Sequence, residues 1–238
     1  MILFPLLGEL IILFIGLLVI YIVIAAVFFR EEILSALQRD PAARSSLEVI
    51  LTYSGFHAII IHKMAHALYK AKLPLLPRLI SQIGRGITGI EIHPGAEIGK
   101  GLFIDHGMGV VIGETTIIGN NVTLFQGVTL GGTGKERGKR HPTIGDNVVV
   151  GTGAKILGNI KIGDNVNVGA NAVVIRGVPP NSTVVGVPGR VAKKEGKKIP
   201  GINLNHTSLP DPLANALEHL QYEIDKIETE LKEWHKDK

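Results

Sequence analysis

The sequence contains no cysteine among its 238 residues. This absence excludes disulfide bonds, thiolate metal ligands and a cysteine nucleophile, and it agrees with a reducing compartment. Basic residues exceed acidic residues only slightly, 25 against 21. The short basic clusters at 135–140 and 193–198 have no aromatic residues between them, so we expect no nucleic-acid partner. Such clusters instead suit the phosphates of a single ligand.

Glycine, in contrast, is abundant, with 29 residues concentrated between Gly84 and Gly201. This enrichment predicts many tight turns. The hydrophobic fraction of 45% is enough for a buried core, and the length suits one ordinary domain with a smaller one beside it.

The first part of the chain is a long apolar run. Leu10 to Phe29 is a stretch of twenty residues without a charge, which as a helix would span roughly 30 Å of hydrocarbon. No basic region precedes it and no small-x-small cleavage site follows, so a signal peptide is disfavoured. Arg30, Arg39 and Arg44 follow the run, which predicts that residues 10–29 anchor the chain in the cytoplasmic membrane with its bulk in the cytoplasm. A helix buried in an oligomer interface is the alternative.

A six-residue repeat occupies the centre of the chain. Alternation at period two, expected of an ordinary half-buried sheet, is absent, and so much glycine and β-branching opposes a helix. The pattern predicts a parallel β-helix with three flat faces and about eighteen residues in each coil. Its aliphatic positions are Ile92, Ile98, Ile104 and Val110, then Ile112, Ile118, Leu124 and Leu130, then Ile144, Val150, Ile156, Ile162, Val168 and Val174.

These patterns predict a mainly β protein with a helical N-terminal part. The expected divisions are an apolar helix at 1–29, a helical domain at 30–89, a β-helix domain at 90–192, and a basic tail with an amphipathic helix at 193–238. The C-terminal helix has the apolar spacing of a short coiled coil, although packing on its own β-helix would also explain it. The apolar positions are Leu213, Leu217, Leu220, Ile224, Ile227, Leu231 and Trp234.

The repeat breaks between Leu130 and Ile144, where residues 131–143 read GGTGKERGKRHPT. This insertion should project as a loop, and functional residues are common on loops held by a rigid scaffold. It has a glycine entry, four basic residues and a histidine fixed before Pro142.

Around this loop the sequence resembles the serine O-acetyltransferases, a family of hexapeptide-repeat acyltransferases. The likeness covers roughly residues 30–190. It implies a left-handed parallel β-helix, three copies packed about a threefold axis and active sites between neighbours. The matching runs are RDPAARS at 39–45, GFHAIIIHKMAHALY at 55–69, IEIHPGAEIGKGLFIDHGMGVVIGET at 90–115, GVTLGGTGKERGKRHPTIGDN at 127–147 and VPPNSTVVGVPGR at 178–190.

The resemblance implies transfer of the acetyl group of acetyl-CoA to the hydroxyl of L-serine, the first committed step of cysteine biosynthesis. Such a reaction needs a base for the serine hydroxyl, and an imidazole suits this because its pKa lies near neutrality. His106, directly after Asp105, is the candidate. The resemblance assigns Glu91 as the carboxylate that orients it. Direct transfer in a ternary complex agrees with the absence of cysteine.

The resemblance places Asp40, Asp105, Arg140 and His141 around the amino acid. The two aspartates suit its ammonium group, and the planar fork of Arg140 suits its carboxylate. Because Asp40 belongs to the helical region, that region should close the site from above.

For acetyl-CoA the resemblance points to Gly132, Thr133, Thr152 and Ala170. Lys193 and Lys194 are placed to neutralise CoA phosphates, or else belong to a solvated tail. A backbone N–H of residues 131–133 would stabilise the oxyanion of the intermediate. No permanently bound cofactor and no metal is expected.

Three other functions stay open. The acceptor could be a sugar or another hydroxyl compound, although a neutral sugar gives no reason for the charged residues. A zinc hydratase on the same fold would use His93, His106 and His141. A membrane scaffold without activity would use the β-helix only to trimerise. His57, His62 and His66 are expected to serve packing and hydrogen bonding.

The expected assembly is a homotrimer. Some relatives form dimers of trimers and end in an isoleucine that inserts into a sulfhydrylase partner, whereas this sequence ends in Lys-Asp-Lys. A hexamer, the sulfhydrylase complex and feedback inhibition by cysteine are therefore left undecided.

Overall fold

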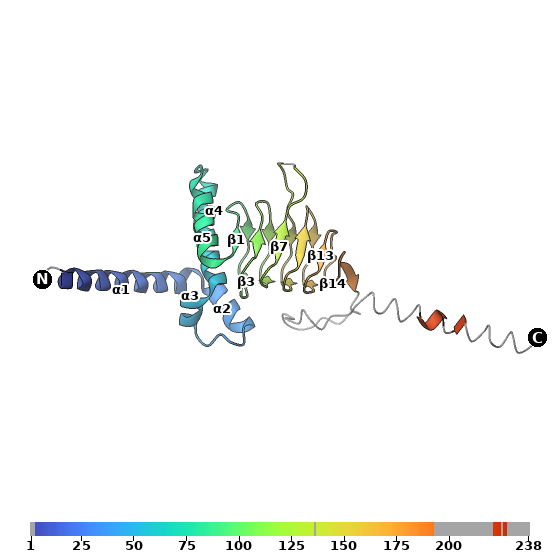
Figure 1. The fold of residues 1–238 in the computed structure, drawn as a ribbon, viewed down its shortest axis with the longest axis horizontal. Helices are drawn as coiled ribbons and strands as arrows, with labels where there is room; N and C mark the ends of the chain where they lie inside the picture. Colours follow the sequence, from blue (N-terminus) through green and yellow to red (C-terminus); the bar gives the residue numbers. More distant parts are fainter. Residues whose placement is uncertain (1–2, 136, 193–220, 225, 228–238) are drawn as a thin grey trace, which may run out of the picture.

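The computed structural model describes residues 3–135, 137–192, 221–224 and 226–227. In this part of the chain, helices come first and short strands follow (Figure 1). The helices are α1 (Leu3–Phe28), α2 (Arg30–Arg39), α3 (Ser46–Thr52), α4 (Ser54–Lys70) and α5 (Leu76–Thr88).

The strands form three sheets, and successive strands up to Val173–Val174 go to successive sheets, whereas the last two strands both join the third sheet. Sheet A contains β1 (Glu91–Ile92), β4 (Val111–Ile112), β7 (Thr129–Gly131), β10 (Lys155–Leu157) and β13 (Val173–Val174). Sheet B contains β2 (Glu97–Ile98), β5 (Ile117–Ile118), β8 (Thr143–Ile144) and β11 (Lys161–Ile162). Sheet C contains β3 (Phe103–Ile104), β6 (Thr123–Leu124), β9 (Val149–Val150), β12 (Asn167–Val168), β14 (Thr183–Val185) and β15 (Arg190–Ala192). Only the pair β14–β15 is antiparallel among these strands. The predicted parallel β-helix is confirmed.

The coils are longer than the regular eighteen residues at two places. Thr129 pairs with Val111, and Val173 with Lys155, each eighteen residues along the chain. Val111 pairs with Glu91 twenty residues before it, because the corner between β3 and β4 contains two extra residues. Lys155 pairs with Thr129 over twenty-six residues, because the predicted loop follows β7. Both irregularities carry predicted site residues.

The aliphatic ladder fills the inside of the coils. All its positions are buried except Ile98, which is half-buried against the others. Asparagines at several corners adopt the left-handed backbone region that their short polar side chains tolerate. Three of them, Asn147, Asn165 and Asn181, are linked side chain to side chain up one corner. Core and corners therefore both follow the repeat.

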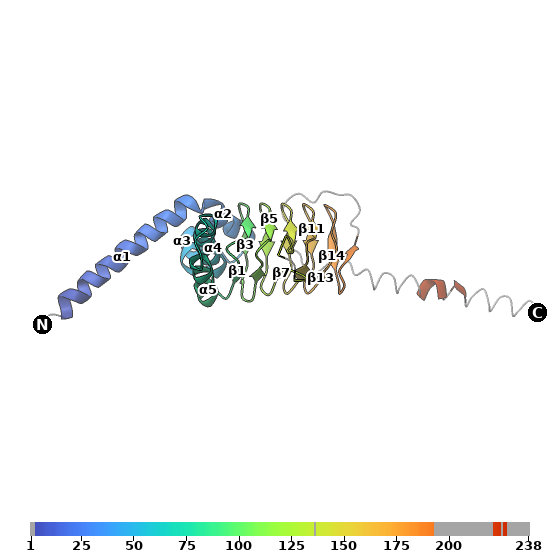
Figure 2. The ribbon, with the colours of Figure 1, turned by 90° about the horizontal axis from the view of Figure 1, so that it is seen from above.

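The segment 30–89, which we call the helical cap, covers the first coil (Figure 2). Its own apolar cluster includes Ile33, Val49 and Phe56, and it packs on Phe103 of sheet C. Arg39 fixes the contact, since its buried guanidinium donates to the carbonyl oxygens of Gly101 and Val122 at 3.2 Å. Arg39, one of the basic residues that follow the apolar run, thus lies against the β-helix.

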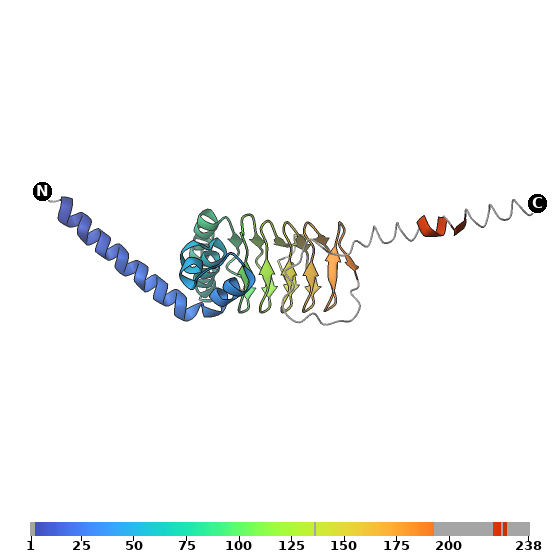
Figure 3. The same cartoon turned by 90° about the horizontal axis from the view of Figure 1, so that it is seen from below.

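Helix α1 projects away from the β-helix (Figures 1 and 3). Gly8–Phe28 is long and apolar enough to cross a membrane, and only 6% of it is buried. Its end packs on the cap through Ala25, with Tyr21 and Ile22 beside it. The rest of its apolar surface has no cover in the described part of the chain.

Most of the predicted C-terminal helix lies outside the described residues. Residues 221–224 and 226–227 are helical, and Ile224 and Ile227 are exposed. Leu213, Leu217, Leu220, Leu231 and Trp234 fall in the part that the structure does not describe, as do Lys193 and Lys194.

Candidate active site

The predicted site residues of the β-helix flank one face, sheet A. The C–A border is the row of corners where the chain passes from sheet C to sheet A, and it carries Asp105, His106, Thr152 and Ala170. The A–B border is the row of corners from sheet A to sheet B, and it carries Gly132, Thr133, Arg140 and His141. Glu91 lies on sheet A itself. A single chain therefore holds the predicted residues in two separate groups.

On the C–A border, Asp105 and His106 occupy the corner with the two extra residues. His106 has a positive φ of 56°, and Gly107 follows with a φ of 79°. The wider corner presents the imidazole to solvent, with 74% of its side chain exposed. One carboxylate oxygen of Asp105 lies 3.9 Å from Nε2 of His106. The imidazole is thus reachable by a substrate, with a carboxylate beside it.

The helical cap adds Asp40 next to this corner. Asp40 directly follows Arg39, so the buried guanidinium also fixes the carboxylate. One oxygen of Asp40 accepts the backbone N–H of Ala42 at 2.8 Å, and the other accepts the hydroxyl of Tyr53 at 2.5 Å. Both bonds orient the carboxylate.

Tyr53 and Ser54 were missed by the sequence reasoning. Ser54 Oγ donates to the carbonyl oxygen of His106 at 3.4 Å, so the start of α4 touches the corner. Burial raises the pKa of Tyr53, as do its hydrogen bond to Asp40 and the nearby charge of Asp105. Both carboxylates predicted to bind the ammonium group therefore act on one tyrosine. The only sequence signal was position, because the two residues directly precede the matching run at 55–69.

Glu91 is adjacent to the same corner but has another partner. Its backbone N–H donates to the carbonyl oxygen of Val110 at 2.9 Å, at the end of the corner that carries His106. Its carboxylate lies 3.2 Å from a guanidinium nitrogen of Arg85, an exposed residue of α5. The expected contact between Glu91 and His106 is not formed in this chain.

On the A–B border, one threonine organises Arg140 and His141. The hydroxyl oxygen of Thr115 accepts both of their backbone N–H groups, at 3.0 and 3.1 Å. The same hydroxyl lies 2.9 Å from Nδ1 of the buried His141. Glu114 accepts a hydrogen bond from the Arg140 guanidinium at 2.5 Å. The end of the loop is thereby fastened to the coil below it.

Gly113 completes this arrangement. A Cβ at this position would lie 2.0 Å from Cδ2 of His141, so a side chain would displace the imidazole. The hydrogen bond from Arg140 lowers the pKa of Glu114, and burial lowers the pKa of His141. The imidazole is therefore neutral at pH 7 beside a charged guanidinium. Residues 113–115 end a run that matched the family, but their role in holding the loop was not foreseen.

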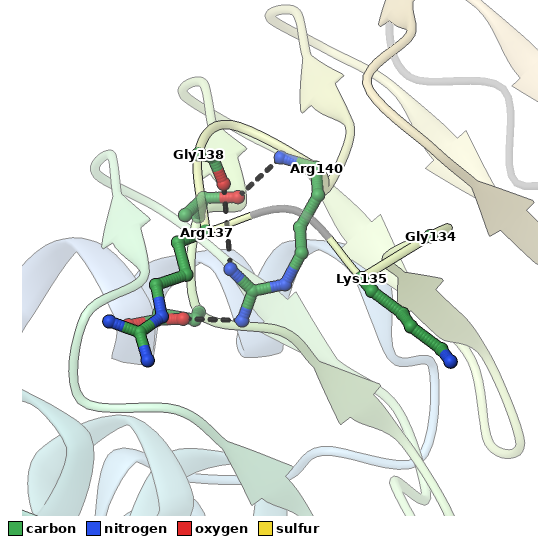
Figure 4. A pocket seen from close by; sticks show the side chains of 7 residues that line it. Gly134, Lys135, Arg137, Gly138 and Arg140 are labelled. Atoms are coloured by element: carbon green, nitrogen blue, oxygen red, sulfur yellow. Dashed lines mark hydrogen bonds and ion pairs between the residues drawn. The ribbon is translucent and has the colours of Figure 1, made fainter.

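The loop itself encloses a cavity of about 480 Å³. Figure 4 shows Arg140 turned toward Gly138 inside the loop, with Arg137 and Lys135 on either side. Glu114 is the acidic group of the lining. Gly132 and Thr133 are exposed at the base of the loop. This surround of cations suits a ligand with negative charge.

The remaining predicted histidines join the cap to the β-helix. His62 is buried, and burial lowers its pKa to about 3. His66 bonds the carbonyl oxygen of Pro94 through Nδ1 at 2.8 Å, and the pKa of His93 is lowered to about 4 by burial. Among the described residues, no group of three His, Asp or Glu side chains is placed to hold a metal ion. His57 likewise bonds the carbonyl oxygen of Ile50 through Nε2 at 2.8 Å. His62 is packed in the interior, and its buried Nδ1 has no hydrogen-bond partner among the described residues.

Comparisons with known proteins bear on the family and the fold. The family model described as bacterial transferase hexapeptide (six repeats) matches residues 141–176. The serine acetyltransferase of Bacillus subtilis is 60% identical over 209 residues, which are 87% of this chain and 96% of that protein. The crystal structure of Neisseria gonorrhoeae serine acetyltransferase is 44% identical with a TM-score of 0.70, over 71% of this chain and 65% of that chain. The same enzyme in complex with serine gives 43% identity and a TM-score of 0.67, over 69% and 67% of the two chains. The shared fold is the left-handed parallel β-helix with helices before it.

Proposed function

The chain belongs to the serine acetyltransferase family, and we propose that it transfers the acetyl group of acetyl-CoA to the hydroxyl of L-serine. The products are O-acetyl-L-serine and CoA, and the reaction is the first committed step of cysteine biosynthesis. One observation carries the proposal. Two carboxylates and an exposed imidazole gather on the C–A border, while Arg140 and His141 stand on the A–B border. Such a site has groups for both charges of a free amino acid.

His106 acts as the general base. Its imidazole takes the proton of the serine hydroxyl as that oxygen bonds to the acetyl carbon, and the carbon–sulfur bond of the thioester then breaks. The proton passes on to the departing thiolate of CoA. Asp105, 3.9 Å away, stabilises the imidazolium. Glu91 contacts His106 once its carboxylate has left Arg85. The ion pair with Arg85 is weak, because the Arg85 side chain is more than half exposed.

The substrate charges divide between the two borders. The ammonium group binds between Asp105 and Asp40, whose carboxylate Tyr53 holds in place. The carboxylate of serine binds the guanidinium of Arg140, taking a place that Glu114 fills in the free chain. His141 offers its free ring nitrogen to the same carboxylate. Both ends of the substrate are thereby fixed, which aligns the hydroxyl with His106.

A complete site needs two copies of the chain. Sheet A separates His106 from Arg140 within one β-helix. If three copies pack with sheet A toward a common axis, the C–A border of each copy meets the A–B border of the next. The homotrimer is therefore the functional unit, and a dimer of trimers would leave its sites unchanged.

Acetyl-CoA binds along the same seam. Gly132 and Thr133 line it from one copy, and Thr152 and Ala170 line it from the other. Lys135 and Arg137, which line the loop cavity, bind the phosphates. Lys193, outside the described residues, is proposed as a further cation for them. Acetyl-CoA is a co-substrate, and no cofactor is permanently bound.

Acceptors that lack one charge test this function. L-serine is compared with ethanolamine, which has no carboxylate, with 3-hydroxypropanoate, which has no ammonium group, and with a galactoside. We expect turnover with serine and at least a hundredfold lower kcat/KM with the others. Equal turnover with the galactoside would show that the acceptor is a sugar.

We also propose that residues 10–29 anchor the enzyme in the cytoplasmic membrane, with the catalytic part in the cytoplasm. The support is the length of α1 and its lack of cover, with 6% of Gly8–Phe28 buried. We expect the activity in the membrane fraction of expressing cells, released by detergent and not by high salt. Full activity in the soluble fraction without detergent would instead favour a helix buried between copies.

A further inference from the structure

The helical cap has a second exposed apolar surface besides α1. It consists of Met64 on α4 and Leu75, Leu76, Leu79, Ile83 and Ile87 on and just before α5, and we call it the basal face. These side chains are between 45% and 70% exposed. Large apolar patches on a protein surface mark places of contact with another molecule or a membrane.

Helix geometry shows where the α5 part of this face points. Ser81 faces the β-helix, because its hydroxyl donates to the carbonyl oxygen of Ile92 at 2.6 Å. Leu79 and Ile83 lie two residues before and after Ser81, roughly 200° around the helix. They therefore point away from the β-helix. Gly84 packs on Ile61 of α4, which places the neighbouring helix at the side.

Met64 has the same direction on α4. It lies between His62, which is buried under the cap, and His66, which bonds the carbonyl oxygen of Pro94. Both histidines are two residues from Met64, so its side chain is on the opposite side of the helix. The two helices thus expose apolar side chains on the same side, away from the β-helix.

Helix α1 leaves the protein on this same side. Figure 1 shows α1 and the β-helix on opposite sides of α4 and α5. The axes of α4 and α5 run across the direction in which α1 and the β-helix extend. Figures 2 and 3 give the same arrangement from above and below. If α1 crosses a bilayer, α4 and α5 lie along the bilayer surface with the basal face toward it.

The charges of these helices fit an anionic surface. Between Glu48 and Glu91 the chain carries five basic residues and no acidic residue. Two of them, Lys70 and Lys72, are exposed where α4 ends, next to Leu75. Each such cation near an anionic membrane contributes about 1 kcal/mol of attraction. A second protein copy would gain little from this charge and would have to fit around α1.

We propose that the basal face lies in the headgroup region of the membrane, so that α4 and α5 form an interfacial contact beside α1. This inference rests on the proposed anchoring by α1. The contact holds the β-helix on the far side of the cap, with both borders of sheet A open to the cytoplasm. An amphipathic helix with apolar residues on one face and cations at its edge binds membranes in this way.

The absence of cysteine gives a direct test. A single cysteine replaces Ile83 or, as the matched control one position away, Gln82, which is exposed outside the basal face. A third variant, Ile20→Cys, reports on α1. Each full-length variant is labelled with an environment-sensitive fluorophore in phosphatidylcholine vesicles with phosphatidylglycerol. The vesicles contain lipids with a nitroxide quencher at a shallow or a deep acyl position.

We expect the label at 83 to shift to shorter wavelength and to lose at least half its emission to the shallow quencher, while the label at 82 changes little. A blue shift at 83 without lipid quenching would mean that protein covers the face, and would overturn the inference. The label at 20 keeps the two proposals apart. Quenching at 20 and not at 83 leaves the anchor and removes the interfacial contact. Quenching at 83 and not at 20 would keep the interfacial contact and remove the anchor.

Discussion

The β-helix and the helical cap are built by different rules and share one site. In the β-helix, identical positions of successive coils stack, and the aliphatic ladder is buried except at the half-buried Ile98. In the cap, individual contacts such as that of Arg39 with Gly101 determine the position of Asp40. A regular repeat gives a rigid scaffold, and the residues proposed to bind serine lie where the repeat is interrupted or where the cap reaches over it. Replacing a side chain in the β-helix should therefore change different measured properties from replacing one in the cap.

The largest effect is expected at the wide corner. Replacement of His106 by Asn removes the base and keeps a residue that tolerates the positive φ of 56°. We expect kcat to fall roughly 10² to 10⁴-fold, since general-base catalysis contributes about that much. The mass of the assembly should not change, which light scattering checks. Unchanged kcat in this variant would remove His106 from the mechanism.

A truncation in the ladder should act on stability instead. Leu130 is fully buried between neighbouring coils, and Leu130→Ala is expected to cost about 2 to 5 kcal/mol in the free energy of unfolding. Ile117, 39% exposed on sheet B, is the matched control. Its change to alanine should cost clearly less in urea denaturation. Equal losses would contradict a core that lies inside the coils.

The next largest effect is expected at the contact of Arg39 between the cap and the β-helix. Arg39→Met removes the donor to the carbonyl oxygen of Gly101 and one of two donors to that of Val122, which keeps the backbone N–H of Phe103, at an expected cost of roughly 2 to 3 kcal/mol. Because Asp40 is adjacent, the KM for serine should rise while that for acetyl-CoA stays constant. Arg44→Met, on the exposed segment that follows, is the control. A KM for serine unchanged in Arg39→Met would show that the cap does not position the substrate.

The contact between the cap and the β-helix should also weaken in acid. His62 has a pKa of about 3 in the folded chain and about 6.5 when unfolded, so below pH 6.5 the unfolded state binds the proton and the folded state does not. Stability is then full above pH 6.5 and falls as the pH drops toward 3, by at most about 1.4 kcal/mol per pH unit. His62→Gln should flatten this slope in urea denaturation between pH 7 and 5. Parallel slopes would mean that His62 is not the group responsible.

The smallest effect is expected at Tyr53. Tyr53→Phe removes the hydroxyl that binds Asp40 and keeps the ring. The loss of about 1 kcal/mol for one hydrogen bond corresponds to roughly a fivefold rise in the KM for serine. The kcat and the KM for acetyl-CoA should stay within twofold, which steady-state kinetics measures. A fall in kcat alone would assign Tyr53 another role.

Most of the β-helix could be predicted from the sequence because its core follows a strict period. The ladder from Ile92 to Val174 is buried as predicted except at the half-buried Ile98, and the broken period located the loop. The cap could not be predicted in the same way, because its contacts join residues far apart in sequence. No periodic pattern in the sequence predicts the hydrogen bond from Tyr53 to Asp40 or that from Arg39 to Gly101.

Residue types alone also left the pairings of the site unsettled. Arg140 was identified as a charged group for the substrate, but its bond to Glu114 depends on the path of the loop over the coil below. Glu91 was expected to face His106, and its carboxylate instead faces Arg85. Which residues form an ion pair between a helix and a strand depends on side-chain geometry. The spacing of residues in the sequence does not give that geometry.

Complementation between two inactive variants tests the shared site most directly. His106→Asn removes the C–A half and Arg140→Ala removes the A–B half, so each trimer alone should be nearly inactive. When the two variants are expressed together and assemble into mixed trimers, some seams join two intact halves. We predict that the mixture regains at least a tenth of the normal kcat per chain. Mixed trimers without any recovered activity would contradict a site formed between two copies.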